Sequence, residues 1–174
     1  MIQVVADAVL VVFVCTAAWW DTRADRIPNE LTVTGLAAAL MLRAPLGSDA
    51  VARGLAGLGI AFLISIILYA LRAIGGGDVK LLAGVGAFLG SGEIVGALGL
   101  IAVLGAAFAL LSVTRKGMLP LLIWNTMELV KSFVSLGQSG KARGLGSPAA
   151  LTIPYGVPIA AGTLIWWFGQ GVRL

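Results

Sequence analysis

Long apolar runs separated by short polar stretches make up most of the chain. Six of these runs are predicted to form membrane-embedded helices, at residues 2–20, 31–46, 54–74, 79–91, 94–114 and 150–170. A helix needs about 20 apolar residues to cross a bilayer, so the first, third, fifth and sixth runs are long enough. The second and fourth are short, and we expect each to be buried among its neighbours or partly re-entrant.

The composition supports a membrane protein. The 174 residues are 59% hydrophobic and 11% charged, whereas about a quarter of the residues in a soluble domain are charged. The sequence therefore predicts an all-α, polytopic membrane protein with about six transmembrane helices, and residues 1–174 are expected to form one domain. Its 24 glycines favour close packing between helices.

The stretch 118–136 is ambiguous. Asn125, Glu128 and Lys131 recur at helical spacing within an apolar surround, which favours a helix lying in the membrane interface. A seventh span is the alternative, and it would place the C-terminus on the other side of the membrane. Residues 137–148 have the composition of a flexible linker.

The distribution of basic residues predicts the orientation of the chain. Nine of the twelve lysines and arginines fall in the loops at 21–30, 72–80 and 115–149, which share one side of the membrane. Cytoplasmic loops carry the excess of lysine and arginine, so Asp21 and Asp78 are both expected at the cytoplasmic face. No basic run is long enough to follow a phosphate backbone, so the lipid bilayer, and not nucleic acid, is the predicted partner.

The chain has no histidine and one cysteine, Cys15. The missing histidines exclude Ser-His-Asp and Cys-His catalysis and His-ligated zinc. Cys15 lies inside the first apolar run, where we expect a buried and unreactive thiol. No metal and no other cofactor are predicted, so carboxylates, amines, hydroxyls and the main chain remain for chemistry.

Two aspartates at the ends of apolar runs are the candidate catalytic residues. Asp21 follows the first run, and Asp78 follows a cluster of three glycines. A carboxylate near hydrocarbon is costly and marks a functional site, and two carboxylates that share a site supply one base and one acid. The residues alone leave two alternatives open: ordinary charges at the membrane boundary, and a cation or proton site in a small transporter.

The glycine cluster consists of Gly75, Gly76 and Gly77. Glycine permits positive φ angles and close approach of another chain. We therefore expect a loop against which a substrate strand can lie.

Three further residues near the aspartates are candidates for substrate binding or for shaping a loop. Lys80 is expected to contact a substrate carbonyl or to temper the charge of Asp78, with snorkelling to the interface as the alternative. Asn29 is expected to orient a loop or a substrate backbone, or else to cap the second run. Pro28 predicts the start of that helix.

Three other acidic residues are not predicted to be catalytic. Asp25 and Glu30 lie in the polar loop after Asp21, and we expect them to be solvated or to attract a basic peptide. Asp7 lies inside the first apolar run and has no partner that the sequence reveals.

Three blocks of the sequence resemble the aspartic type IV prepilin peptidases. The segment from Asp21 to Thr32, with Ile27-Pro28-Asn29 inside it, resembles the first conserved block of that family. Residues 75–82, Gly-Gly-Gly-Asp-Val-Lys-Leu-Leu, are similar to its Gly-x-Gly-Asp block, and residues 153–158, Ile-Pro-Tyr-Gly-Val-Pro, resemble the third block. Their order and separations fit, so the resemblance covers roughly residues 5–170.

The resemblance implies a membrane endopeptidase whose catalytic aspartates map onto Asp21 and Asp78. Such enzymes are multi-pass proteins of the inner membrane that cut the basic leader from prepilins and pseudopilins at the cytoplasmic face. The chain starts at the first catalytic span and lacks Cys-x-x-Cys pairs, so it is similar to the short, peptidase-only forms of Flp (tight-adherence) pili. Pro154, Tyr155 and Gly156 are expected to shape the entry to the last span. A non-catalytic assembly protein of a pilus or secretion machine is a further hypothesis.

Overall fold

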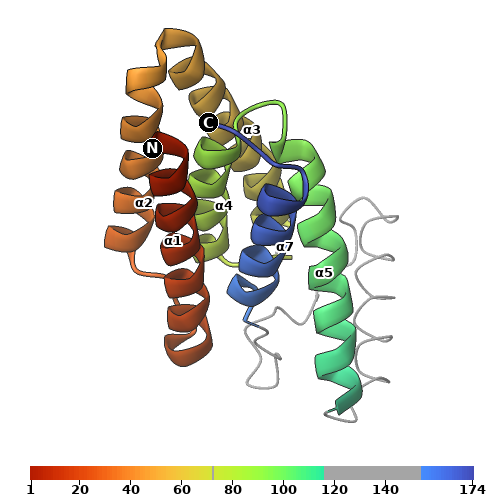
Figure 1. Cartoon of the computed structure of the whole chain (residues 1–174). Coiled ribbons are helices and arrows are strands. Elements are labelled where there is room, and N and C mark those ends of the chain that lie inside the picture. Colours follow the sequence, from red (N-terminus) through yellow and green to blue (C-terminus); the bar gives the residue numbers. More distant parts are fainter. Residues whose placement is uncertain (72, 116–153) are drawn as a thin grey trace. The chain divides into compact units, whose positions relative to one another are not determined.

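The computed structural model describes residues 1–71, 73–115 and 154–174. Within these residues the chain forms six α-helices and one 3₁₀-helix and no strand, which confirms the predicted all-α membrane protein. The elements are α1 (Ile2–Ala24), α2 (Asn29–Arg43), η1 (Ala44–Leu46), α3 (Ser48–Ala70), α4 (Gly76–Leu89), α5 (Ile94–Arg115) and α7 (Gly156–Gly169) (Figure 1). The expectations for 118–136 and 137–148 lie outside the described residues.

The chain divides into two compact units. The first unit comprises Met1–Gly105 and Pro154–Leu174, and the second comprises Ala106–Ile153. Asp21, Asp78 and all of the other candidate site residues lie in the first unit.

Three of the described helices are long and apolar enough to cross a membrane: α1, α3 and the part Ile94–Ser112 of α5. The last apolar run was predicted to be another span, but the helix described there, α7, has only 14 residues. α7 begins at Gly156 and carries Pro158 in its first turn, where a proline costs no intrahelical hydrogen bond.

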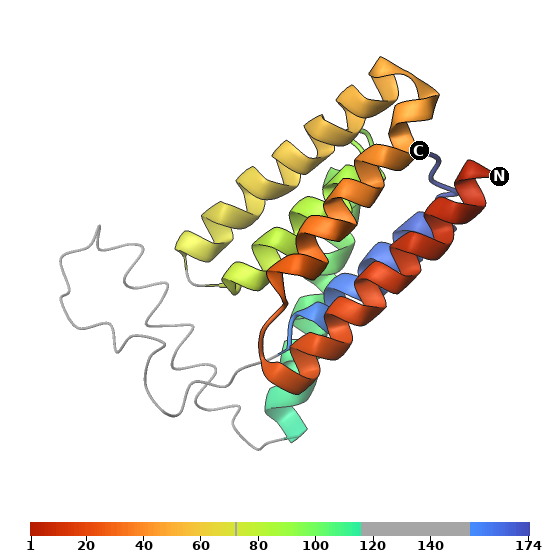
Figure 2. The same cartoon turned by 90° about the vertical axis from the view of Figure 1, so that its left-hand side faces the viewer.

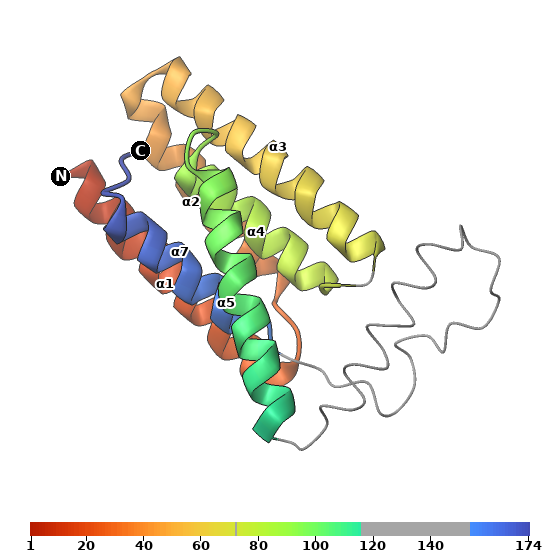
Figure 3. The ribbon, with the colours of Figure 1, turned by 90° about the vertical axis from the view of Figure 1, so that its right-hand side faces the viewer.

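α4 lies at the centre of the first unit, where it packs against α1, α2, α3 and α7 (Figures 1 and 3). Ten of its 14 residues are buried, which confirms that the short fourth run is enclosed by its neighbours. The same expectation is wrong for α2, because α2 buries only a stripe of four residues. A central helix that is apolar on all sides fits burial on all sides.

Glycines allow α3 and α4 to approach each other closely. A Cβ atom added to Gly57 of α3 would collide with the carbonyl oxygen of Gly86 of α4, and one added to Gly86 would collide with the carbonyl oxygen of Gly57. This is the small-residue packing that the glycine content predicts for helices in a membrane.

Arg43 binds the C-terminal end of α4. The guanidinium, which is 1% exposed, donates to the carbonyl oxygens of Ala87 and Phe88 at 2.8 Å each and of Ala50 at 3.1 Å. A cation at the C-terminal end of a helix is favourable because the free carbonyls carry partial negative charge. The lack of a side chain at Gly54 leaves the space that the Arg43 side chain fills.

The two chain ends lie side by side, and α7 runs along α1 (Figures 2 and 3). The indole N–H of Trp167 donates to Asp7 at 2.8 Å, and the side-chain amide of Gln3 donates to Asp7 at 3.0 Å and to the carbonyl of Val172 at 3.2 Å. Asp7 is therefore part of a polar clamp between α1 and the C-terminal segment.

The expectation that Cys15 is buried is wrong, because its side chain is exposed. α1 buries the stripe Ala6, Leu10, Phe13, Val14, Ala17 and Asp21, and Cys15 faces away from it. Apolar residues line both the packed and the lipid-facing sides of a membrane helix, so an apolar neighbourhood in sequence does not distinguish the two sides.

Candidate active site

The two candidate aspartates lie where three helix ends meet. The C-terminal end of α1 and the N-terminal ends of α4 and α7 lie at the same end of the first unit (Figures 1 and 3). Asp21 is in the last turn of α1 and Asp78 in the first turn of α4. Both carboxylates are buried, at 9% and 7% exposed, and they lie close enough for the charge of Asp21 to contribute to the pKa of Asp78.

The end of α1 differs from the sequence prediction. The helix continues past the apolar run to Ala24, so Asp21 belongs to the helix and not to the loop after it. Asp25 ends the helix with φ of 50°, in the left-handed region that aspartate tolerates better than most residues. Asp25 is exposed and turns the chain toward α2.

Asp21 is held by the first residue of α7. The backbone N–H of Gly156 donates to Oδ2 of Asp21 at 2.7 Å. Amides in the first turn of a helix have no acceptor within the helix and favour a nearby negative charge. A Cβ atom on Gly156 would lie 2.9 Å from both Cβ and Oδ2 of Asp21, so the contact requires glycine. The sequence placed Gly156 at the entry to the last span and gave it no part in the site; its position beside Tyr155 in the third block was the available signal.

Asp78 is held by its own helix. Its Oδ2 accepts the backbone N–H of Gly75, the residue that caps α4, at 2.9 Å. Burial raises the pKa of Asp78 from 3.8 to about 6; the Gly75 hydrogen bond opposes this rise, and the charge of Asp21 adds to it. The loss of hydration therefore raises the pKa of Asp78 by more than the amide hydrogen bond and the helix terminus lower it.

The glycine cluster is not the loop that the sequence predicted. Gly76 and Gly77 form the first turn of α4, and none of the three glycines has a positive φ. The glycines do allow a neighbouring segment to approach closely, as expected. A Cβ atom added to Gly77 would lie 3.4 Å from Cβ of Ile27. Ile27, in the connection between α1 and α2, occupies the space beside Gly77.

Lys80 and Asn29 bind each other. The ammonium group of Lys80 donates to Oδ1 of Asn29 at 2.7 Å, and both residues are exposed. The bond joins the start of α2 to the second turn of α4. Asn29 makes no side-chain cap, and Pro28 precedes the helix as predicted, with φ of −59°.

Tyr155 precedes Gly156 and caps the N-terminal end of α7. Its hydroxyl lies against Gly105 of α5, where an added Cβ would come within 2.8 Å of the oxygen. Burial raises the pKa of Tyr155, and the charge of Asp78 raises it further. The start of α7 thus brings the Gly156 amide to Asp21, a contact that the sequence analysis missed.

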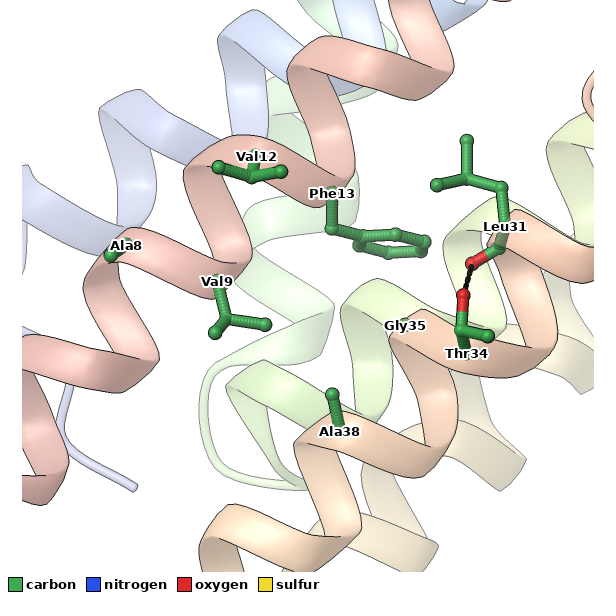
Figure 4. A pocket seen from close by; sticks show the side chains of 8 residues that line it. All are labelled: Ala8, Val9, Val12, Phe13, Leu31, Thr34, Gly35 and Ala38. Carbon is green, nitrogen blue, oxygen red and sulfur yellow. Dashed lines mark hydrogen bonds between the residues drawn. The ribbon is translucent and has the colours of Figure 1, made fainter.

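The other candidate features lie apart from the aspartates. An open apolar groove of about 360 Å³ runs between α1 and α2 (Figure 4), and it is lined by Ala8, Val9, Val12, Phe13, Leu31, Thr34, Gly35 and Ala38. Thr34 is its only residue with a polar side chain, and its hydroxyl donates to carbonyls of its own helix.

Among the described residues, no group of three or more His, Cys, Asp or Glu side chains could hold a metal ion.

The arrangement supports acid–base chemistry. Two buried carboxylates, each bound by a main-chain amide, can hold a water molecule and divide the tasks of accepting and donating a proton. The pKa of about 6 for Asp78 allows that carboxyl to carry a proton close to neutral pH.

Comparison with known proteins gives one match. The sequence profile described as the type IV leader peptidase family matches residues 8–110, which is 103 of the 174 residues and includes both aspartates. No curated protein and no solved structure matched the chain. With more than half of its length matched, and with both aspartates in the matched region, the chain belongs to the type IV leader peptidase family.

Proposed function

We propose that the protein is an aspartic endopeptidase that cuts the basic leader from type IV prepilins or pseudopilins, with Asp21 and Asp78 as its catalytic residues. The observation that carries this proposal is the meeting of two buried carboxylates, close enough for one charge to act on the other, at the ends of α1 and α4. Membership of the leader peptidase family names the class of substrate.

In the proposed reaction one carboxylate, ionised, takes a proton from the bound water as the water oxygen attacks the scissile carbonyl carbon. The other carboxyl, protonated, gives its proton to the carbonyl oxygen. The tetrahedral intermediate then breaks its C–N bond, and the leaving nitrogen takes the proton that came from water. A hydroxyl proton of the intermediate returns to the carboxylate that had protonated the carbonyl oxygen, so the C=O bond of the product forms and the pair regains its single proton. The raised pKa of Asp78 favours a pair that holds one proton in total.

We place the site at the cytoplasmic face of the inner membrane. The basic residues of the loops favour this orientation, and the burial of Arg43 strengthens it. The three basic residues outside those loops are Arg43, Arg53 and Arg173, and the guanidinium of Arg43 is bound by carbonyls inside the protein. Arg53 and Arg173 are then left as the exposed basic residues on the opposite side.

We further propose that the protein acts as a peptidase only and serves an Flp-type pilus. This rests on the sequence, because the chain has one cysteine and therefore no Cys-x-x-Cys pair. Incubation with a prepilin and a methyl donor should yield a cleaved product without a methyl group on its new N-terminus.

The first prediction concerns the two aspartates. Asp21→Asn and Asp78→Asn are each expected to lower the rate of leader cleavage by about 10²–10⁴-fold, because each removes an acid–base group. The measurement is cleavage of a leader-bearing prepilin by the full chain in lipid vesicles, with insertion checked for each variant.

Asp25→Asn is the matched control. It removes an exposed carboxylate four residues from Asp21 and keeps a side chain that tolerates the left-handed conformation. We expect cleavage at the rate of the unaltered protein. Normal processing by either dyad variant would contradict the catalytic assignment.

A small proton or cation transporter is the second candidate, and the pKa of Asp78 near neutrality also suits a proton-relaying carboxylate. Proteoliposomes separate the two functions. Ion flux that depends on Asp78 without any peptide cleavage would favour transport, and cleavage without flux would favour the peptidase.

A further inference from the structure

The first turn of α4, which carries Asp78, has little support of its own. It begins with Gly76 and Gly77, and Gly75 precedes it as the cap. Glycine is the least favourable helix former after proline, and Gly75 has no side chain that could bind the free amides of the turn. The Asp78 carboxylate accepts the amide of Gly75, but such a bond weakens when the carboxyl carries a proton. Contacts from outside the helix are therefore needed to hold Asp78 in one place.

Two such contacts come from the start of α2 and from the connection before it. Ile27, which is 6% exposed, lies against Gly77, where an added Cβ would be 3.4 Å from the Ile27 Cβ. Asn29 accepts a hydrogen bond from the ammonium group of Lys80 at 2.7 Å. Gly77 precedes Asp78 and Lys80 follows it by two residues. α4 is therefore held just before and just after the carboxylate that it carries.

We propose that Lys80 and Asn29 are positioning residues, whose hydrogen bond holds the glycine-rich first turn of α4 and so keeps the carboxyl of Asp78 in its reactive place. This inference rests on the proposed peptidase function and adds no group to the chemistry. Asn29 follows Asp21 by eight residues, so the bond also limits how far the two carboxylates can move apart. A misplacement of about 1 Å can cost about 10²-fold in rate.

Two rival explanations account for the same bond. Both of its partners are exposed, and exposed polar pairs often contribute nothing measurable. In that case its loss changes neither kcat nor KM. Alternatively, Lys80 leaves Asn29 and binds a substrate carbonyl, and its loss then raises KM. A positioning role instead lowers kcat through the state of the first turn of α4.

Lys80→Met and Asn29→Leu each remove one partner and keep a side chain of similar size. For the full chain in lipid vesicles we expect kcat of prepilin cleavage to fall about 3–10-fold in each, because one hydrogen bond shifts a conformational equilibrium by about that factor. KM should change less than about twofold. The double variant should lose no more than either single variant, since both remove the same bond. Asn29→Asp keeps the oxygen acceptor and should retain the rate.

Gly76→Ala tests how the bond acts. Gly76 has space for a methyl group, since the nearest atom to an added Cβ belongs to the ring of Tyr69, at 3.6 Å. Alanine also stabilises a helix more than glycine does. If Lys80 acts by holding the first turn, Gly76→Ala should raise kcat of Lys80→Met by about twofold or more. The loss of a substrate contact would not be recovered in this way.

Arg53→Met is the matched control, because it removes an exposed cation on α3, and we expect it to leave both constants unchanged. Rates are compared at equal amounts of folded protein, with thermal unfolding measured for each variant. The inference is overturned if Lys80→Met cleaves at the rate of this control, if its loss is confined to KM, or if Gly76→Ala recovers none of the loss. A normal rate for Asp78→Asn would instead remove the peptidase mechanism. An inactive Asp78→Asn with an unaffected Lys80→Met would remove only the positioning role.

Discussion

Asp78 shows how burial sets the chemistry of a single residue. Its carboxyl occupies a favourable place for an anion, in the first turn of a helix and bound by an amide. The pKa is nevertheless raised to about 6, because the loss of hydration is larger than both favourable effects. Sequence position predicts the two favourable contributions, and only the packed structure shows that the loss of hydration is larger.

This raised pKa predicts how stability depends on pH. Between pH 3.8 and about 6 the folded protein holds a proton on Asp78 that the unfolded chain has released. The stability of the folded state therefore falls as the pH rises through this window, by about 2–3 kcal/mol in total. Thermal unfolding of the purified protein from pH 3.5 to pH 7 measures the change.

Asp78→Asn is the reference for that measurement, because every other titrating group is retained. The difference in stability between the two proteins should change across the window and stay constant above it. An equal pH dependence in both would contradict the raised pKa.

The residues that hold the aspartates were harder to predict than the aspartates themselves. Asp21 and Asp78 stand out because a carboxylate near hydrocarbon is costly. Gly156 follows Asp21 by more than 130 positions, and it has no side chain that could indicate a role. A main-chain amide is present in nearly every residue, so only the fold shows which amide reaches a carboxylate.

α4 carries Asp78, and each of its two ends has a side-chain charge opposite to the partial charge of that helix terminus. Asp78 lies at its N-terminal end and the guanidinium of Arg43 at its C-terminal end. Each charge opposes the partial charge of its helix terminus. The three hydrogen bonds from Arg43 to carbonyl oxygens also join α2, α3 and α4. They therefore fix the position of the C-terminal end of α4 relative to α2 and α3.

Arg43→Met is expected to destabilise the protein by about 2–5 kcal/mol, because it leaves buried carbonyls without donors. Arg43→Lys should recover only part of this loss, since one ammonium group cannot reproduce the planar fork of arginine. The measurement is thermal or denaturant unfolding in detergent.

Arg53→Met is the control for this prediction. Arg53 is the neighbouring arginine on α3, and its side chain is exposed, so its loss should change stability by less than about 0.5 kcal/mol. Equal effects of Arg43→Met and Arg53→Met would show that the buried carbonyl bonds do not contribute.

The ends of the helices were the least predictable part of each element. α1 runs on to Ala24 and α4 begins at Gly76, whereas the apolar pattern ends α1 at residue 20 and begins the fourth run at residue 79. The additional helical residues, 21–24 of α1 and 76–78 of α4, are mostly polar residues and glycines at the membrane boundary. Hydrophobicity marks where a helix is in contact with apolar surroundings, and capping residues decide where it stops.

The first unit is held together at both ends of the α1–α7 pair. At one end Gly156 binds Asp21, and at the other Trp167 and Gln3 bind Asp7. The second clamp keeps α7 alongside α1, so it also supports the placement of the Gly156 amide. Polar bonds of this kind are favoured between membrane helices, where water offers no competing partner.

The proposed orientation of the protein in the membrane predicts which loops are accessible from outside. Cys15→Ala removes the only cysteine, and single cysteines can then be placed at Glu30 and Ser48, exposed positions at the start of α2 and of α3. A membrane-impermeant maleimide applied to intact spheroplasts should label Ser48→Cys, and should label Glu30→Cys only after permeabilisation. The reverse pattern would place the aspartates on the outer side.

The sequence by itself determined the class of the protein and its two chemical groups. Long apolar runs require helices in a membrane, because lipid cannot satisfy a free backbone, and a carboxylate beside such a run is a candidate functional group because it is costly there. The tertiary structure alone decided what surrounds these groups: the amide of Gly156 on Asp21, and Arg43 at the far end of α4. These contacts depend on how helices distant in sequence pack, and apolar patterns carry little of that information, since the lipid-facing and protein-facing sides of a membrane helix are both apolar.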